Sequence, residues 1–164
     1  MGVNDGFLDM MACPGCGEKV LMRLQIKIDG VDMHDYRPGR PVTSEVLESV
    51  RRNESEFVSA VRRDFAIPEA DLSEIGLESA DGSFVVVGEA RCVGRACKCG
   101  QSSKYVSCVA IVDKGVFRGF SPDLPKDGPI VTDHGMVIPR WMLRNETLRS
   151  SLMETLDDYF AGEL

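Results

Sequence analysis

The chain has 164 residues, of which 43% are hydrophobic and 27% are charged, and its formal net charge is −7. This length and composition fit one domain with its own hydrophobic core. A negatively charged chain repels phosphate backbones unless its cations gather on one face, so nucleic acid is a disfavoured partner. No stretch approaches the roughly 20 apolar residues of a membrane-spanning helix, so we expect no membrane association.

The N-terminal residues, 1–11, carry neither the positive region nor the apolar run of a signal peptide. This predicts a cytoplasmic protein. In that compartment, the six cysteines of the chain are expected to be metal ligands or buried thiols rather than disulfides.

The first half of the chain predicts two strands and one long helix. Apolar and polar residues alternate over 20–28, which indicates a half-buried strand, and the hairpin signal Asp29-Gly30 predicts a returning strand over 31–36. A helix is expected over 43–65, capped by Thr43 or Ser44. Its apolar stripe is interrupted by Asn53 and Glu54, which leaves a kink or a break open at that point.

The second half predicts a meander of strands followed by a helix. The expected strands lie at 75–79, 83–93, 105–112 and 116–120, with hairpin signals at 80–82 and 113–115. Residues 121–128 are expected to be loop. Asn145 can cap a final helix that ends at Gly162, and the helix gains Trp141 and Met142 if it begins as early as Pro139.

Together these elements predict an α+β fold, in which an antiparallel sheet of five or six strands packs against two main helices. One domain is expected over 1–164. Residues 1–19 would form an N-terminal arm, residues 20–121 would hold the strands and the long helix, and residues 122–164 would form a loop and the C-terminal helix.

Two short cysteine motifs stand far apart in the chain. They are Cys13-Pro14-Gly15-Cys16-Gly17 in the expected arm and Cys97-Lys98-Cys99-Gly100 between two expected strands. The first resembles the cysteine knuckle of zinc ribbons and rubredoxins, and the second resembles it with one residue fewer between its cysteines. In such a knuckle the turn aims backbone N–H groups at the first sulfur, and Gly17 permits a positive φ.

Four thiolates on two tight turns suit a tetrahedral metal ion. We therefore expect Cys13, Cys16, Cys97 and Cys99 to hold one Zn²⁺ that staples the arm to the sheet, with iron as the alternative metal. Of the remaining cysteines, Cys108 is expected to be a buried core residue. Cys92 is expected to be buried too, with the alternative that it replaces Cys99 as a ligand.

A closed set of four thiolates has no open position for water, so the expected zinc is structural. We therefore expect an accessory or adaptor protein that presents a rigid surface to a protein partner. One alternative is an enzyme that uses His34 or His134 beside an aspartate, although Asp133 and His134 would point to opposite faces of a strand.

The other alternative is a nucleic-acid-binding zinc protein. Its contacts would come from the basic residues around the second cysteine motif. These are Arg91, Arg95, Lys98 and Lys104. The same cations could instead offset the negative charge of a zinc tetrathiolate, and this is the role we expect.

Overall fold

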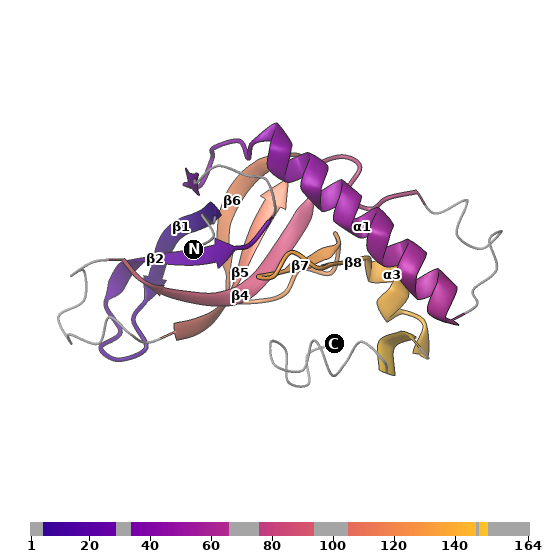
Figure 1. The fold of residues 1–164 in the computed structure, drawn as a ribbon. Helices are drawn as coiled ribbons and strands as arrows, with labels where there is room; N and C mark the ends of the chain where they lie inside the picture. Colours follow the sequence, from indigo (N-terminus) through magenta and orange to yellow (C-terminus); the bar gives the residue numbers. More distant parts are fainter. Residues whose placement is uncertain (1–4, 29–33, 66–75, 94–104, 147, 151–164) are drawn as a thin grey trace.

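The computed structural model describes residues 5–28, 34–65, 76–93, 105–146 and 148–150. These residues form a mixed α+β domain, in which a strongly curled sheet lies under the long helix α1, Ser44–Phe65 (Figure 1). The strands are β1 Asp5–Ala12, β2 Lys19–Ile26, β3 Asp35–Tyr36, β4 Phe84–Cys92, β5 Tyr105–Asp113, β6 Val116–Ser121, β7 Ile130–Thr132 and β8 Val137–Ile138. The expected α+β class is confirmed.

The strand order is β3-β1-β2-β4-β5-β6, with β7 beside β4 and β8 beside β7. Two pairs, β1 with β3 and β4 with β7, are parallel, so the expectation of a purely antiparallel sheet is wrong. The expected hairpin of 31–36 with the preceding strand is also wrong, because β3 pairs with β1 instead. The carboxylate of Asp5 in β1 fixes this pairing: it accepts the His34 N–H at 3.0 Å and the Tyr36 hydroxyl at 2.7 Å.

The N-terminal segment is a sheet strand rather than the expected arm. β1 pairs with β2 over its whole length, from Asp5 opposite Ile26 to Ala12 opposite Lys19. The first cysteine motif is therefore the turn of a hairpin. This strand was not predicted because Asp5 and Asp9 occupy inward-facing positions, on the same face as Phe7.

The sheet curls until its ends meet. Asp9 Oδ2 in β1 accepts the Phe120 N–H of β6 at 2.8 Å. A side-chain hydrogen bond thus takes the place of a main-chain bond between these two strands. Residues 39–42, just after β3, also bond to β6 and to Gly115 in the turn before it, through three main-chain bonds of 2.7–3.0 Å. Inside the curl, Phe7 and Phe117 are fully buried with ring centroids 4.9 Å apart.

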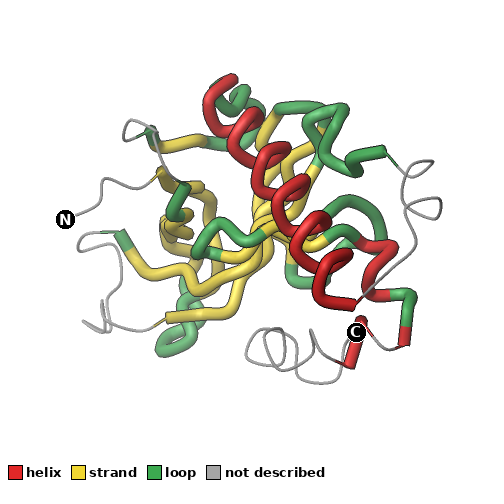
Figure 2. Tube along the Cα trace, turned by 45° about the vertical axis from the view of Figure 1, so that its right-hand side comes forward, coloured by secondary structure: helices red, strands yellow, loops and turns green. Residues whose placement is uncertain are grey.

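Helix α1 follows its predicted span and crosses one side of the curled sheet (Figure 2). Thr43 caps it as expected: its Oγ1 accepts the Val46 N–H at 3.5 Å. Val46 and Val50 pack on the sheet core, while Val61 packs against the C-terminal residues Met142 and Leu148.

Helix α1 does not break at Glu54, and the reason also explains why a predicted strand at 75–79 is not formed in its described part. Glu54 is only 1% exposed, and its carboxylate accepts the N–H groups of Glu78 and Ser79 at 2.6 and 3.0 Å. With its charge satisfied, α1 runs on without interruption. Residues 78–81, expected in part to be a strand, instead form a turn bound to the helix.

Toward the C-terminus some predicted elements are confirmed, and two short strands were not predicted. β4, β5 and β6 lie where strands were expected, and 122–129 is loop. β7 and β8, which are three and two residues long, were not predicted, because such short strands show no periodicity. A short helix, α3 at Arg140–Leu143, precedes Asn145, whose Oδ1 caps the next helical turn by accepting the Leu148 N–H at 3.2 Å.

Most of the expected C-terminal helix lies outside the described residues. Within the described part of the chain, no helix combines the length and the apolar character needed to cross a membrane.

Candidate functional site

The turn between β1 and β2 carries the first cysteine motif. It is closed by two main-chain bonds, from the Cys13 N–H to Glu18 O at 2.7 Å and from the Gly17 N–H to Cys13 O at 2.8 Å. Gly17 has φ +74°, in the left-handed region that was predicted for it. The turn therefore reverses the chain tightly and holds both cysteines on a fixed backbone.

The sulfur of Cys13 is already a hydrogen-bond acceptor. The Gly15 N–H donates to Cys13 Sγ at 3.4 Å, which is the contact expected of a metal-binding knuckle. Cys13 is 2% exposed whereas Cys16 is at the surface, so the turn presents one sulfur beside the core and one toward solvent.

The second cysteine motif, with Cys97 and Cys99, lies outside the described residues, and so do Arg95, Lys98 and Lys104. The chain on either side of that motif is described. Cys92 at the end of β4 pairs with Met22 of β2, and the Val93 N–H donates to Leu21 O at 3.0 Å. Because β4 runs antiparallel to β2, the chain leaves β4 heading toward the start of β2, where the cysteine turn lies (Figure 1).

Cys92 and Cys108 are both buried, as predicted, at 6% and 5% exposure. Burial, with a smaller contribution from the nearby charge of Asp9, raises the pKa of Cys108 to about 12. A group that resists ionisation so strongly is a poor metal ligand. Cys92, at the end of β4 where the chain leads to the second cysteine motif, stays an alternative ligand. Among the described residues alone, no three His, Cys, Asp or Glu side chains form a metal-binding group.

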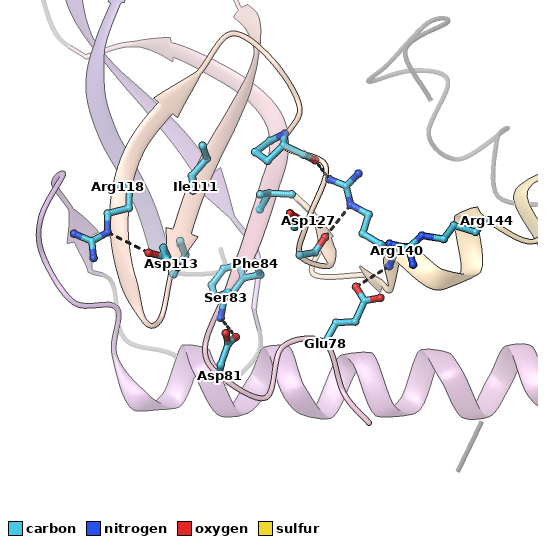
Figure 3. Close-up of a pocket in the computed structure, with 14 residues that line it drawn as sticks. Glu78, Asp81, Ser83, Phe84, Ile111, Asp113, Arg118, Asp127, Arg140 and Arg144 are labelled. Atoms are coloured by element: carbon cyan, nitrogen blue, oxygen red, sulfur yellow. Dashed lines mark hydrogen bonds and ion pairs between the residues drawn. The ribbon is translucent and has the colours of Figure 1, made fainter. Parts of the chain in front are cut away.

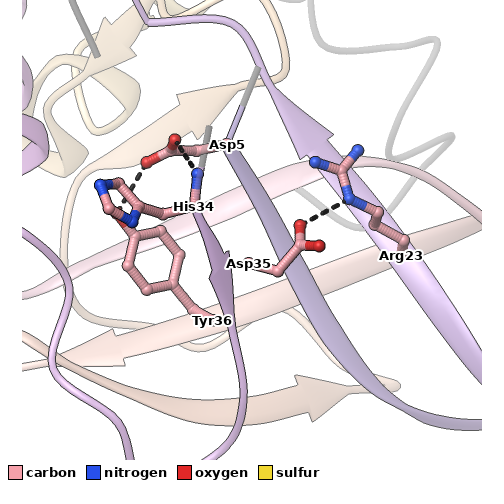
Figure 4. A network of polar contacts seen from close by, with 5 residues as sticks. All are labelled: Asp5, Arg23, His34, Asp35 and Tyr36. Carbon is pink, nitrogen blue, oxygen red and sulfur yellow. Dashed lines mark hydrogen bonds and ion pairs between the residues drawn. The ribbon is translucent and has the colours of Figure 1, made fainter. Parts of the chain in front are cut away.

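The first candidate catalytic residue, His34, is exposed and contacts an acid through its main chain (Figure 4). Its backbone N–H, not its imidazole, donates to Asp5. The other oxygen of Asp5 is taken by the Tyr36 hydroxyl. Burial is the main cause that raises the pKa of Tyr36 to about 12. This group of residues holds β1 and β3 together and offers His34 no acid–base partner.

The second candidate, His134, lies in the turn after β7 with its side chain 70% exposed. Its Nε2 is 3.8 Å from Asp133 Oδ1, so the expectation that these two residues point apart is wrong. They lie in a turn, where the alternation of a strand does not apply. The distance exceeds that of a hydrogen bond, and an exposed pair of this kind contributes little.

Sequence reasoning gave no sign of two neighbouring pockets near α3. The first, shown in Figure 3, has a volume of about 630 Å³. The second has a volume of about 480 Å³, and Arg140 and Arg144 line both. Neither His34 nor His134 is among the residues that line them. Arg140 reaches from α3 to the loop before β7, where its Nε donates to Gly128 O at 2.8 Å and its Nη2 to Pro125 O.

A group of exposed apolar side chains lies beside the cysteine turn, on the outer face of the sheet. Met10 pairs with Leu21, and Leu21 is bonded to Val93, so the three lie in one row across β1, β2 and the end of β4. Met10 is 52% exposed and Val93 38%. Tyr105, 57% exposed, lies opposite the exposed Arg91 on the same face. We call Met10, Leu21, Val93 and Tyr105 the outer patch.

Comparison with protein-family models, curated proteins and solved structures finds no match to this chain. The function must therefore be inferred from the residues of the cysteine turn, the outer patch and the pockets themselves.

Proposed function

We propose that this protein is an intracellular, metal-stabilised adaptor. Cys13, Cys16, Cys97 and Cys99 hold one structural zinc ion, with iron as the alternative, and the outer patch binds a protein partner. The observation that carries the metal assignment is the Cys13 sulfur, which accepts the Gly15 N–H inside a turn closed at the left-handed Gly17.

Two features support a metal at this turn. The exposed Cys16 and the buried Cys13 lie on one rigid hairpin connection, so two ligands are positioned before any ion binds. The chain that carries Cys97 and Cys99 leaves β4 toward this same end of the sheet. A zinc ion with four thiolates carries a net charge of about −2, which the basic residues around the second cysteine motif would partly offset.

The outer patch supports the adaptor part of the proposal. Methionine, tyrosine and arginine are enriched where proteins bind one another, and an apolar patch rimmed by polar groups marks such surfaces. Met10, Tyr105 and Arg91 combine these residue types on one exposed face. A metal that fixes the adjoining turn would keep this face rigid, which lowers the entropy cost of binding.

Metal analysis of the purified protein tests the site. We expect about one zinc or iron per chain, lost in the Cys13→Ser and Cys97→Ser variants and retained in Cys108→Ser. An absorption spectrum separates the metals, because iron thiolates absorb visible light and zinc thiolates do not. Wild-type protein without either metal, or variants that retain it, would contradict the assignment.

Affinity capture tests the partner surface. Tagged wild-type protein should retain a specific protein from extract of the source cells, and Met10→Glu should release it. Met136→Glu is the matched control, because Met136 is 38% exposed and lies in the β7–β8 turn, away from the patch. If both variants capture the partner equally, the interface lies elsewhere on the protein.

A further inference from the structure

The second pocket near α3 is rich in positive charge; we call it the cationic pocket. Its lining residues are Asp123, Leu124, Pro125, Lys126, Arg140, Leu143, Arg144 and Arg149. Among the described residues, four cations and one carboxylate line it, in a chain whose net charge is −7. The described lining of the pocket therefore has the opposite sign of charge to the chain as a whole.

Three of these cations have no carboxylate partner within the part of the chain that the structure describes. Lys126, Arg144 and Arg149 form no ion pair with any carboxylate in the described residues. Elsewhere, Arg23 lies 2.8 Å from Asp35 and Arg118 lies 3.9 Å from Asp113. Unpaired guanidinium groups that share a concave surface create a positive potential that attracts an anion.

The fourth cation is held in place. Arg140 donates from Nε and Nη2 to the carbonyls of Gly128 and Pro125, while its own backbone N–H donates to Glu78 Oε2 at 2.8 Å. The pKa of Arg140 is lowered, chiefly by burial. The charges of Glu78 and Asp127 oppose this shift, and the neighbouring Arg144 adds to it. Its remaining nitrogen, Nη1, bonds to none of the described residues and can donate to a ligand.

Apart from the carboxylate of Asp123, the other described lining residues are apolar. Leu124, Pro125 and Leu143 give the pocket a hydrophobic wall beside its cations. Its volume of about 480 Å³ lies within the range of small-molecule sites. A ligand that fits this combination has an anionic group at one end and an apolar or planar body at the other.

We propose that the cationic pocket binds a small organic phosphate monoester. Arg144, Arg149 and Lys126 would contact the phosphate, and the apolar wall would contact the body of the ligand. A phosphate suits three unpaired cations better than a carboxylate does, because it carries up to two negative charges and accepts paired N–H bonds from arginine. The pocket lies by α3, at the other end of the molecule from the cysteine turn, so this site is independent of the proposed metal (Figure 1).

Calorimetric titration of the full chain with phenyl phosphate tests the proposal, at low ionic strength where charge attraction is least screened. We expect saturable binding that the double variant Arg144→Gln/Arg149→Gln weakens by about tenfold or more. The matched control is Arg37→Gln/Arg40→Gln, which removes the same charge from exposed positions outside the pocket. This control should bind as the wild type does.

Three results would overturn the proposal. The first is wild-type protein that does not bind phenyl phosphate. The second is equal weakening by both double variants, which would show a general charge effect. The third is binding of a phosphoserine peptide without binding of phenyl phosphate, which would indicate a protein ligand. Circular dichroism spectra should coincide for all variants, since the substituted side chains are at least partly exposed.

Discussion

At the residue scale, buried carboxylates organise this protein. Glu54 is 1% exposed and Asp5 is 2% exposed, and each accepts hydrogen bonds from segments distant in sequence. A buried charge is tolerated only when such bonds replace its hydration. The polar residues that obscure the sequence pattern are thus the ones that join β1 to β3 and α1 to the turn at 78–79.

Glu54→Gln should destabilise the protein by roughly 1–3 kcal/mol, because the amide replaces one acceptor oxygen with a donor that faces an N–H group. Glu56→Gln is the control, since Glu56 lies exposed on the same helix. Urea unfolding measures both. If the two variants unfold at the same urea concentration, the carboxylate of Glu54 does not support the fold as described.

Cys108 gives a prediction for pH. Burial raises the pKa of its thiol from 9.0 to about 12 in the folded chain. Folding therefore favours the neutral thiol. Its contribution to the free energy of unfolding is complete below pH 9 and is lost as the pH rises toward 12. Between those limits the stability of Cys108→Ala should fall less steeply than that of wild type. Parallel curves of unfolding free energy against pH would show that this thiol is not involved.

At the element scale, the sequence predicted what depends on periodicity and turns. β2, β4, β5, β6 and α1 have regular patterns and lie where expected. β1 was missed because Asp5 and Asp9 occupy inward positions, and β3 was paired with the wrong strand because only long-range contacts select its neighbour. The cysteine turn could be predicted from five residues, whereas the pockets are built by residues from separate elements and leave no local pattern.

Substitutions at two glycines compare the cost of backbone strain with the cost of a steric clash. Gly17 has φ +74° with no atom within 4 Å of an added Cβ, so Gly17→Ala should cost only about 1–2 kcal/mol of backbone strain. Gly119 has φ +124°, and an added Cβ would lie 2.8 Å from Asp9 Oδ2, which bonds to Phe120. Gly119→Ala should therefore be the more destabilising of the two in thermal unfolding. The reverse order would mean that the Asp9 bridge between β1 and β6 yields easily.

At the scale of the whole molecule, the structure changes what a metal would do. An N-terminal arm stapled to the sheet would depend on the ion for its attachment. β1 instead pairs with β2 over eight residues and is bonded to β3 and β6 as well. The core inside the curled sheet is built from fully buried residues of β1, β2, β4 and β6. The cysteine turn contributes far fewer residues to this core. A metal at the turn would therefore fix one end of a domain whose core is already complete.

Chelation should accordingly loosen one end of the molecule without unfolding it. Zinc sites in small peptides contribute about 10–16 kcal/mol, but that energy includes folding the peptide itself. Here hydrogen exchange after chelation should rise in residues 13–18 and at Val93 and Tyr105. α1 and the β5–β6 hairpin should stay protected, because their bonds do not involve the turn. Loss of protection throughout the sheet would mean that the ion holds the whole fold, and unchanged exchange at the turn would mean that no ion was bound there.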